Sequence, residues 1–97
     1  MTAAIDAASI IRLPRGVKLR FNEVRQKWFL LGPERVFEPD DVAVEILQRI
    51  DGRRTIAAIT QELAEAFHAP LDEICNDVSN FVSHLMELRM LEPVADA

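Results

Sequence analysis

The stretch WFLLGPERVF, from Trp28 to Phe37, decides how this chain folds. Trp28–Leu31 is a continuous apolar run, which is typical of a strand that is covered on both faces. Gly32–Pro33 ends the run, because proline has no amide hydrogen to donate to a neighbouring strand. Glu34–Phe37 reads as the next strand, and Pro39 ends it. The stretch therefore predicts a β-hairpin.

A third strand precedes this hairpin. Val17–Phe21 alternates apolar and basic residues, which puts Val17, Leu19 and Phe21 on one face. Residues 22–27 are mostly polar and reverse the chain. Three strands joined by tight reversals predict an antiparallel meander, in which Glu34–Phe37 lies at an edge. An edge strand leaves N–H and C=O groups that another chain can pair with.

The rest of the chain reads as three amphipathic helices. Asp40 and Asp41 favour the start of the first helix, which ends at Asp51–Gly52. Thr55 caps the second helix, and Pro70 takes the first position of the third. The expected apolar faces are Val42, Ala43, Ile46, Leu47 and Ile50; then Ile56, Ile59, Leu63 and Phe67; and then Leu71, Ile74, Cys75, Val78, Phe81, Val82, Leu85 and Leu88.

These elements predict an α+β fold that is winged-helix-like, with a three-stranded antiparallel sheet followed by a three-helix bundle. At 97 residues the chain is the size of one domain. We expect residues 1–12 to be a flexible arm and residues 13–94 to form the folded domain. Met90 to Val94 is expected to be a short extended tail.

The composition indicates the cellular compartment of the protein. Cys75 is the only cysteine, so an internal disulfide and a cysteine-based metal site are excluded, which fits a reducing cytoplasm. The N-terminal residues do not resemble a secretory signal, and no run reaches the length of a membrane span. We therefore expect a cytoplasmic protein that does not enter a membrane.

Charge is unevenly distributed along the chain. Residues 1–35 carry a net charge of +4 and residues 36–97 carry −9, which gives −5 in total. A basic sheet region on an acidic helical body can steer a charged partner to one side. The alternative is that both are ordinary solvated faces.

No catalytic constellation is evident. His68 and His84 stand in different segments without metal-ligand spacing. Cys75 falls on the apolar stripe of the third helix, which predicts a buried structural thiol. The acidic residues lie on helix faces and at helix starts rather than as a perturbed pair. We expect no enzymatic activity, no catalytic residue, no cofactor and no metal.

Three functions are considered: nucleic-acid binding, peptide binding and homodimerisation. A winged helix raises nucleic-acid binding, but residues 71–88 carry four acidic side chains and no Lys or Arg, so phosphates would be repelled. An edge strand beside the third helix would form a groove for strand addition by an extended peptide. The same edge, or the arm, could instead join two copies in a homodimer.

Several stretches in order resemble the PqqD family of pyrroloquinoline quinone (PQQ) biosynthesis. They are LLGPE at Leu30–Glu34, RVFEPDD at residues 35–41, EIL at Glu45–Leu47, IDGRRT at Ile50–Thr55 and the pair Asp77–Val78. The resemblance covers residues 13–94, so nothing is transferred to residues 1–12.

This resemblance implies a RiPP recognition element, the domain that holds the precursor of a ribosomally made, modified peptide. It implies a peptide chaperone that binds the precursor peptide PqqA and presents it to the radical SAM enzyme PqqE, without catalytic residues or a cofactor. Related domains serve other peptide pathways, so the identity of the precursor stays open. The resemblance places the peptide between the third strand and the third helix, at Glu34, Arg35, Val36, Phe37, Asp77, Val78, Phe81, Val82 and Leu85.

Overall fold

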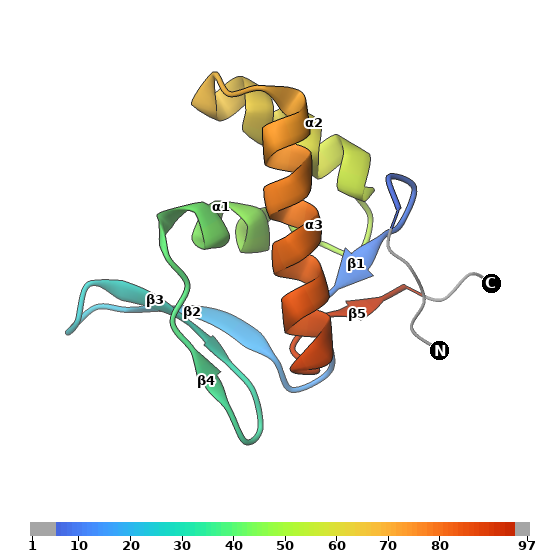
Figure 1. Ribbon diagram of the computed structural model, residues 1–97. Coiled ribbons are helices and arrows are strands. Elements are labelled where there is room, and N and C mark those ends of the chain that lie inside the picture. The colour runs from blue at the N-terminus through green and yellow to red at the C-terminus, as the bar shows by residue number, and fades with distance from the viewer. Residues whose placement is uncertain (1–5, 95–97) are drawn as a thin grey trace.

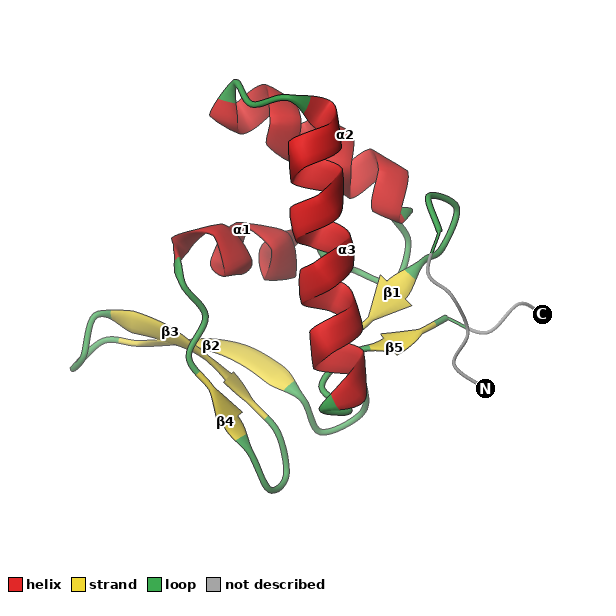
Figure 2. Ribbon diagram, in the orientation of Figure 1, coloured by secondary structure: helices red, strands yellow, loops and turns green. Residues whose placement is uncertain are grey.

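Three helices lie beside a three-stranded sheet in the computed structural model, which describes residues 6–94 (Figures 1 and 2). A separate pair of short strands joins residues 11–12 to residues 92–93. The elements in order are β1 (Ile11–Arg12), β2 (Lys18–Asn22), β3 (Lys27–Leu31), β4 (Val36–Phe37), α1 (Asp41–Arg49), α2 (Ile56–Phe67), α3 (Leu71–Glu87) and β5 (Glu92–Pro93). This arrangement confirms the predicted α+β fold with its antiparallel sheet and three helices.

The meander has the order β2-β3-β4, so β4 is an edge strand, as the sequence predicts. This strand is shorter than expected, because Glu34 and Arg35 belong to the turn rather than to the strand. The Gly32 N–H donates to the Arg35 carbonyl at 2.8 Å and closes that turn. The strand β4 itself therefore begins only at Val36.

Only one face of this sheet packs on the helices. Leu19, Leu30 and Phe37 turn toward the core, and Leu30 is fully buried. The prediction that Trp28–Leu31 is covered on both faces is wrong, since Leu31 is 38% exposed. The reason is that all three helices lie on the same side of the sheet, so the second face has no layer against it.

The far end of the sheet extends beyond the helices (Figure 1). Phe21 lies on the same side of β2 as Leu19, but it is 42% exposed and packs edge-on against Trp28, with 5.3 Å between ring centroids. The turn that follows is more exposed still, with Val24 at 95%. This end of the sheet is held by cross-strand pairs rather than by the core.

The helix caps follow the sequence. The Asp40 carboxylate accepts the Ala43 N–H at 2.8 Å, and the Thr55 hydroxyl accepts the Ala58 N–H at 3.1 Å. Pro70 occupies the N-cap of α3 instead of its first helical position. Each side-chain cap satisfies an amide that the first turn of a helix leaves without a partner.

Four residues predicted on the buried helix faces lie outside the core. Val42, Phe67 and Leu71 are 43%, 44% and 54% exposed, and Cys75 is exposed as well. The three apolar residues lie at or next to helix ends, where neighbouring elements give little cover. Cys75 follows the buried Ile74, and one residue along a helix rotates a side chain by about 100° out of a buried stripe.

The N-terminal segment is joined to the rest of the fold from Ala7 onward, where the Ala7 carbonyl accepts the Ala57 N–H at 3.0 Å. β1 pairs with β5, and Ile10 bridges to Thr55. Ile11 is 1% exposed, and the Arg12 guanidinium lies 2.7 Å from the Glu92 carboxylate. A buried isoleucine and a strand partner therefore join Ile10–Arg12 to the folded domain, and the division of the chain into a flexible arm of residues 1–12 and a domain of residues 13–94 stays a prediction. Residues 1–5 lie outside the described part.

The C-terminal tail is extended over Glu92–Pro93, and it is anchored by the buried Met90 and Leu91. It crosses to β1 rather than to the meander, so β1 and β5 lie on the opposite side of α3 from β4 (Figure 1). None of the helices between residues 6 and 94 is long and apolar enough to span a membrane.

Candidate functional site

The outer edge of β4 presents backbone groups to solvent. Leu31 faces Val36 across β3 and β4, and the next pair toward the turn is Gly32 with Arg35, which is hydrogen-bonded. Hydrogen-bonded and non-hydrogen-bonded pairs alternate along an antiparallel ladder. The Leu31–Val36 pair is therefore not hydrogen-bonded, and the N–H and C=O of Val36 point away from β3.

Within residues 6–94 nothing pairs with that outer edge. β4 is the last strand of its sheet, and the C-terminal strand that could have covered it pairs with β1. Val36 is 65% exposed. The edge can therefore accept the backbone of another chain.

A cavity of about 430 Å³ lies beside β4, between this strand and the helices α1 and α3. Phe37 of β4 and Phe81 of α3 form its aromatic part, with ring centroids 6.1 Å apart and planes inclined by 54°. Both rings are partly buried against the core. The other lining residues are Glu38, Asp40, Val42, Ala43, Ile46, Asp77 and Asn80.

The lining is acidic on its polar side. Three carboxylates, those of Glu38, Asp40 and Asp77, border the cavity, and no Lys or Arg does. Asp40 is held by its role as the α1 cap, and Glu38 lies 3.4 Å from the Lys27 ammonium in an exposed pair. An apolar floor with an acidic border fits an apolar side chain that has a cationic group nearby.

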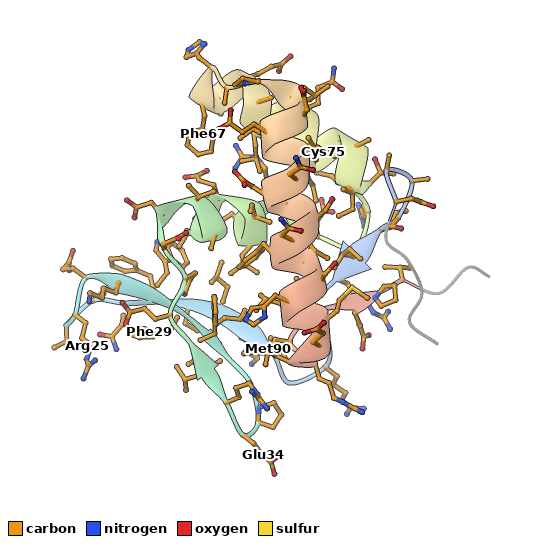
Figure 3. The ribbon with its side chains drawn as sticks, in the orientation of Figure 1. Arg25, Phe29, Glu34, Phe67, Cys75 and Met90 are labelled. Atoms are coloured by element: carbon orange, nitrogen blue, oxygen red, sulfur yellow. The ribbon has the colours of Figure 1, made fainter. Side chains whose placement is uncertain are left out.

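The structure brings together part of the predicted site. Phe37, Asp77 and Phe81 line the cavity, and Val36 stands at the open edge next to it. Glu34 and Arg35 lie instead at the exposed β3–β4 turn (Figure 3, where Glu34 is labelled), beside a second cavity of about 260 Å³ near the C-terminal end of α3. Contact of these residues with a peptide stays a prediction.

Three predicted wall residues do not face the cavity. Val78, Val82 and Leu85 are between 0% and 1% exposed and belong to the main core. Their stripe on α3 turns inward in this structure, and contact of these three residues with a peptide stays a prediction. They act as the support behind Phe81, which lies on the adjacent stripe.

Sequence reasoning missed six of the lining residues, which are Glu38, Asp40, Val42, Ala43, Ile46 and Asn80. Helical spacing could have found Asn80, because it lies one turn from Asp77 on α3. Val42 reads as a core residue from its spacing. Its place at the cavity depends on how α1 is set against β4, which no local pattern records.

The other candidate groups that the structure describes lie away from the β4 cavity. No cluster of His, Cys, Asp and Glu side chains suited to a metal ion occurs in the part of the chain that the structure describes. His68 ends α2 with a φ of 52°, and Cys75 borders a hollow between α2 and α3. The pKa of Asp51 is lowered by the backbone N–H groups of Arg54 and Arg53, but this turn lies between α1 and α2 and does not line the β4 cavity.

Comparison with known proteins gives consistent matches. Residues 27–91 match the family described as coenzyme PQQ synthesis protein D (PqqD). The chain is 46% identical over 90 residues to the PqqA binding protein of Rhizobium meliloti (strain 1021), with 93% of this chain and 92% of the relative covered. It is 47% identical over 92 residues to the PqqA binding protein of Rhodopseudomonas palustris (strain BisB5), with 95% and 81% covered.

Two solved structures resemble the fold. One is the solution NMR structure of the PqqD truncation of Methylobacterium extorquens PqqCD, described as a functional, stand-alone RiPP recognition element. The match has a TM-score of 0.79 and 44% identity, covering 92% of this chain and 95% of the other. The other is the crystal structure of PqqD from Xanthomonas campestris, with a TM-score of 0.59 and 42% identity, covering 82% and 89%.

Proposed function

The chain belongs to the PqqD family, and on that premise we propose that it binds the precursor peptide PqqA by strand addition to β4. The observation that carries this proposal is the open edge at Val36 beside the cavity between β4, α1 and α3. Relatives that cover nearly the whole chain are named for binding PqqA, which supports the choice of ligand.

The backbone of the peptide pairs with the outward N–H and C=O of Val36. A net gain of about 0.5–1.5 kcal/mol for each hydrogen bond does not offset an ordering cost of about 2–5 kcal/mol for a flexible peptide. Burial of a Leu-sized side chain contributes about 1.5–3 kcal/mol more. Side chains that enter the cavity at Phe37 and Phe81 therefore decide the affinity, and pairing at β4 decides the direction and register.

We further propose that the chain holds the peptide for the radical SAM enzyme PqqE without catalysing a step itself. The names of the relatives support this role, because they describe PqqA binding and a RiPP recognition element. A bound strand would be fixed along one side of the domain, with its ends extending past β4 toward a second protein.

Titration of ¹⁵N-labelled protein with PqqA peptide tests the proposed site. The amide signals of Val36, Phe37, Asp77 and Phe81 should shift together and saturate at one peptide per chain. Shifts confined to the hollow near Cys75, or no shifts at all, would contradict strand addition at β4.

Self-association is the competing use of the same edge, because an unpaired strand can pair with its counterpart in a second copy. If the edge holds peptide, sedimentation should show that added PqqA converts any dimer into a peptide-bound monomer. A dimer that persists at saturating peptide would place the dimer contact elsewhere.

A further inference from the structure

The face of the β2–β3–β4 sheet that turns away from the helices is a second surface of unusual composition. We call it the outer face and define it by Lys18, Arg20, Phe29, Leu31 and Val36. Strand register places Lys18, Leu31 and Val36 in one row across the sheet and Arg20 beside Phe29 in the next. Directly paired residues point to the same side of a sheet, so the five side chains are neighbours.

The middle of the outer face is apolar and exposed. Leu31 and Val36 are 38% and 65% exposed, Phe29 is partly exposed, and none of them packs on the core. The opposite face of the same strands sends Leu19 and Leu30 into the core. Adjacent exposed apolar side chains, unlike scattered ones, indicate a surface that another molecule covers.

The border of the outer face is positively charged. Lys18 and Arg20 are exposed, and the ion pairs found between residues 6 and 94 include neither of them. The Lys27–Glu38 pair, at 3.4 Å, neutralises the side of the face toward the β2–β3 turn. The outer face thus carries two uncompensated cations on a chain whose net charge is −5.

We propose that the outer face docks a second protein whose contact surface has carboxylates around an apolar centre. The second protein is the enzyme that modifies the bound peptide, an assignment that rests on the proposed function. Apolar side chains at the centre and charges at the border are the arrangement found in protein–protein interfaces.

The composition favours protein over nucleic acid. Two cations can neutralise about two phosphates, which releases few counterions and gives weak binding. Contact with a phosphate backbone would not bury the apolar surface of Leu31 and Val36. Neither side chain has a flat ring on which a base can stack. Both gain from burial against an apolar protein surface.

The outer face remains open when a peptide is bound. The peptide would add at the edge of β4, and its cavity lies on the inner side of the sheet at Phe37. An added strand would continue the outer face, with every second side chain on the same side as Val36. A protein docked there contacts the chain and the peptide together, so it should bind the peptide-loaded form more tightly than the empty one.

Binding of purified PqqE to the immobilised chain tests this inference, with PqqA affinity measured in parallel. Arg20→Glu and Leu31→Ser should each weaken PqqE binding by about tenfold, the loss typical of a central interface residue. Arg20→Glu should leave PqqA affinity within about twofold, because β2 is not adjacent to the added strand. Raising the salt concentration should reduce the difference between Arg20→Glu and the parent chain.

Two control variants match these substitutions in chemistry and exposure. Arg25→Glu makes the same charge change at the β2–β3 turn, the end of the sheet opposite Glu34 (Figure 3). Val24→Ser removes an apolar side chain that is 95% exposed at that turn. Both should bind PqqE as the parent chain does, and thermal melts should show that all four variants are folded.

The outcomes separate the inference from the proposed function. Normal PqqE binding by Arg20→Glu and Leu31→Ser, or equal losses in the two controls, overturns the inference and leaves peptide binding intact. A second outcome would favour nucleic acid and overturn the inference. In that outcome the parent chain is retained on duplex DNA at low salt, and Lys18→Glu abolishes this retention without changing PqqE binding. Failure of the parent chain to bind PqqA overturns the proposed function instead.

Discussion

The rings of Phe37 in the edge strand β4 and Phe81 in the helix α3 are in contact, with 6.1 Å between their centroids. This contact fixes the distance between the backbone of β4 and the wall of α3. It also forms the apolar floor of the cavity, so one pair of rings both supports the site and provides its contact surface.

Phe81→Ala should weaken PqqA binding by about tenfold or more, since a large aromatic contact is lost from the cavity. The ring is partly buried, so the free energy of unfolding should fall by only about 1–2 kcal/mol. Calorimetric titration together with urea denaturation separates the two effects. Phe21→Ala removes a ring outside the cavity and should leave the affinity unchanged. Equal affinity of both variants would contradict the role of Phe81.

Val36→Pro removes the outward N–H of β4 without breaking a bond to β3. PqqA affinity should fall by about two- to tenfold, the value of one backbone hydrogen bond. Val36→Thr keeps the N–H and the branched shape, so it serves as the matched control. If the proline variant binds as tightly as the threonine variant, the amide of Val36 takes no part in binding.

The acidic border of the cavity predicts a charge preference. PqqA variants in which a Lys or Arg is changed to Glu should bind more weakly, and Asp77→Asn should reduce that penalty. The coupling between the two substitutions should be about 0.2–1 kcal/mol, as for exposed ion pairs, and should decrease with salt. A double-mutant cycle measures it directly. No coupling at any cationic position would show that Asp77 does not face the peptide.

Ile11→Ala should lower the free energy of unfolding by about 2–4 kcal/mol, because a side chain that is 1% exposed is cut back to a methyl group. Denaturation by urea gives this value. Val24→Ala, at a position that is 95% exposed, should change stability by less than about 0.5 kcal/mol. Similar values for the two variants would mean that β1 does not hold the two ends of the chain together.

Asp51 should titrate below its ordinary pKa of 3.8, since the backbone N–H groups of Arg54 and Arg53 stabilise its charged form. A carboxyl whose pKa is lower in the folded state adds stability above its unfolded pKa. That stability is lost as the pH falls through the folded pKa. Asp51→Asn should therefore destabilise the chain at pH 7 and have less effect near pH 2. A carboxyl NMR titration that places the pKa of Asp51 at or above 3.8 would contradict this.

The sequence by itself determined the local elements, because their causes lie within a few residues. Strand alternation, the break at Gly32–Pro33 and the caps at Asp40 and Thr55 each depend on neighbours in the chain. The position of β4 at the edge followed from the order of the strands and the tight turns between them. The family resemblance rested on the same short stretches.

Only the tertiary structure decided which side of each element is covered. Helical spacing places Val78 and Phe81 on nearby stripes, but packing buries the first and leaves the second at the cavity. The pairing of Arg12 with Glu92 joins residues 80 positions apart, and no local pattern records it. Side-chain burial depends on contacts between elements that are distant in sequence. The cavity beside β4 and the exposed outer face therefore exist only in the assembled fold.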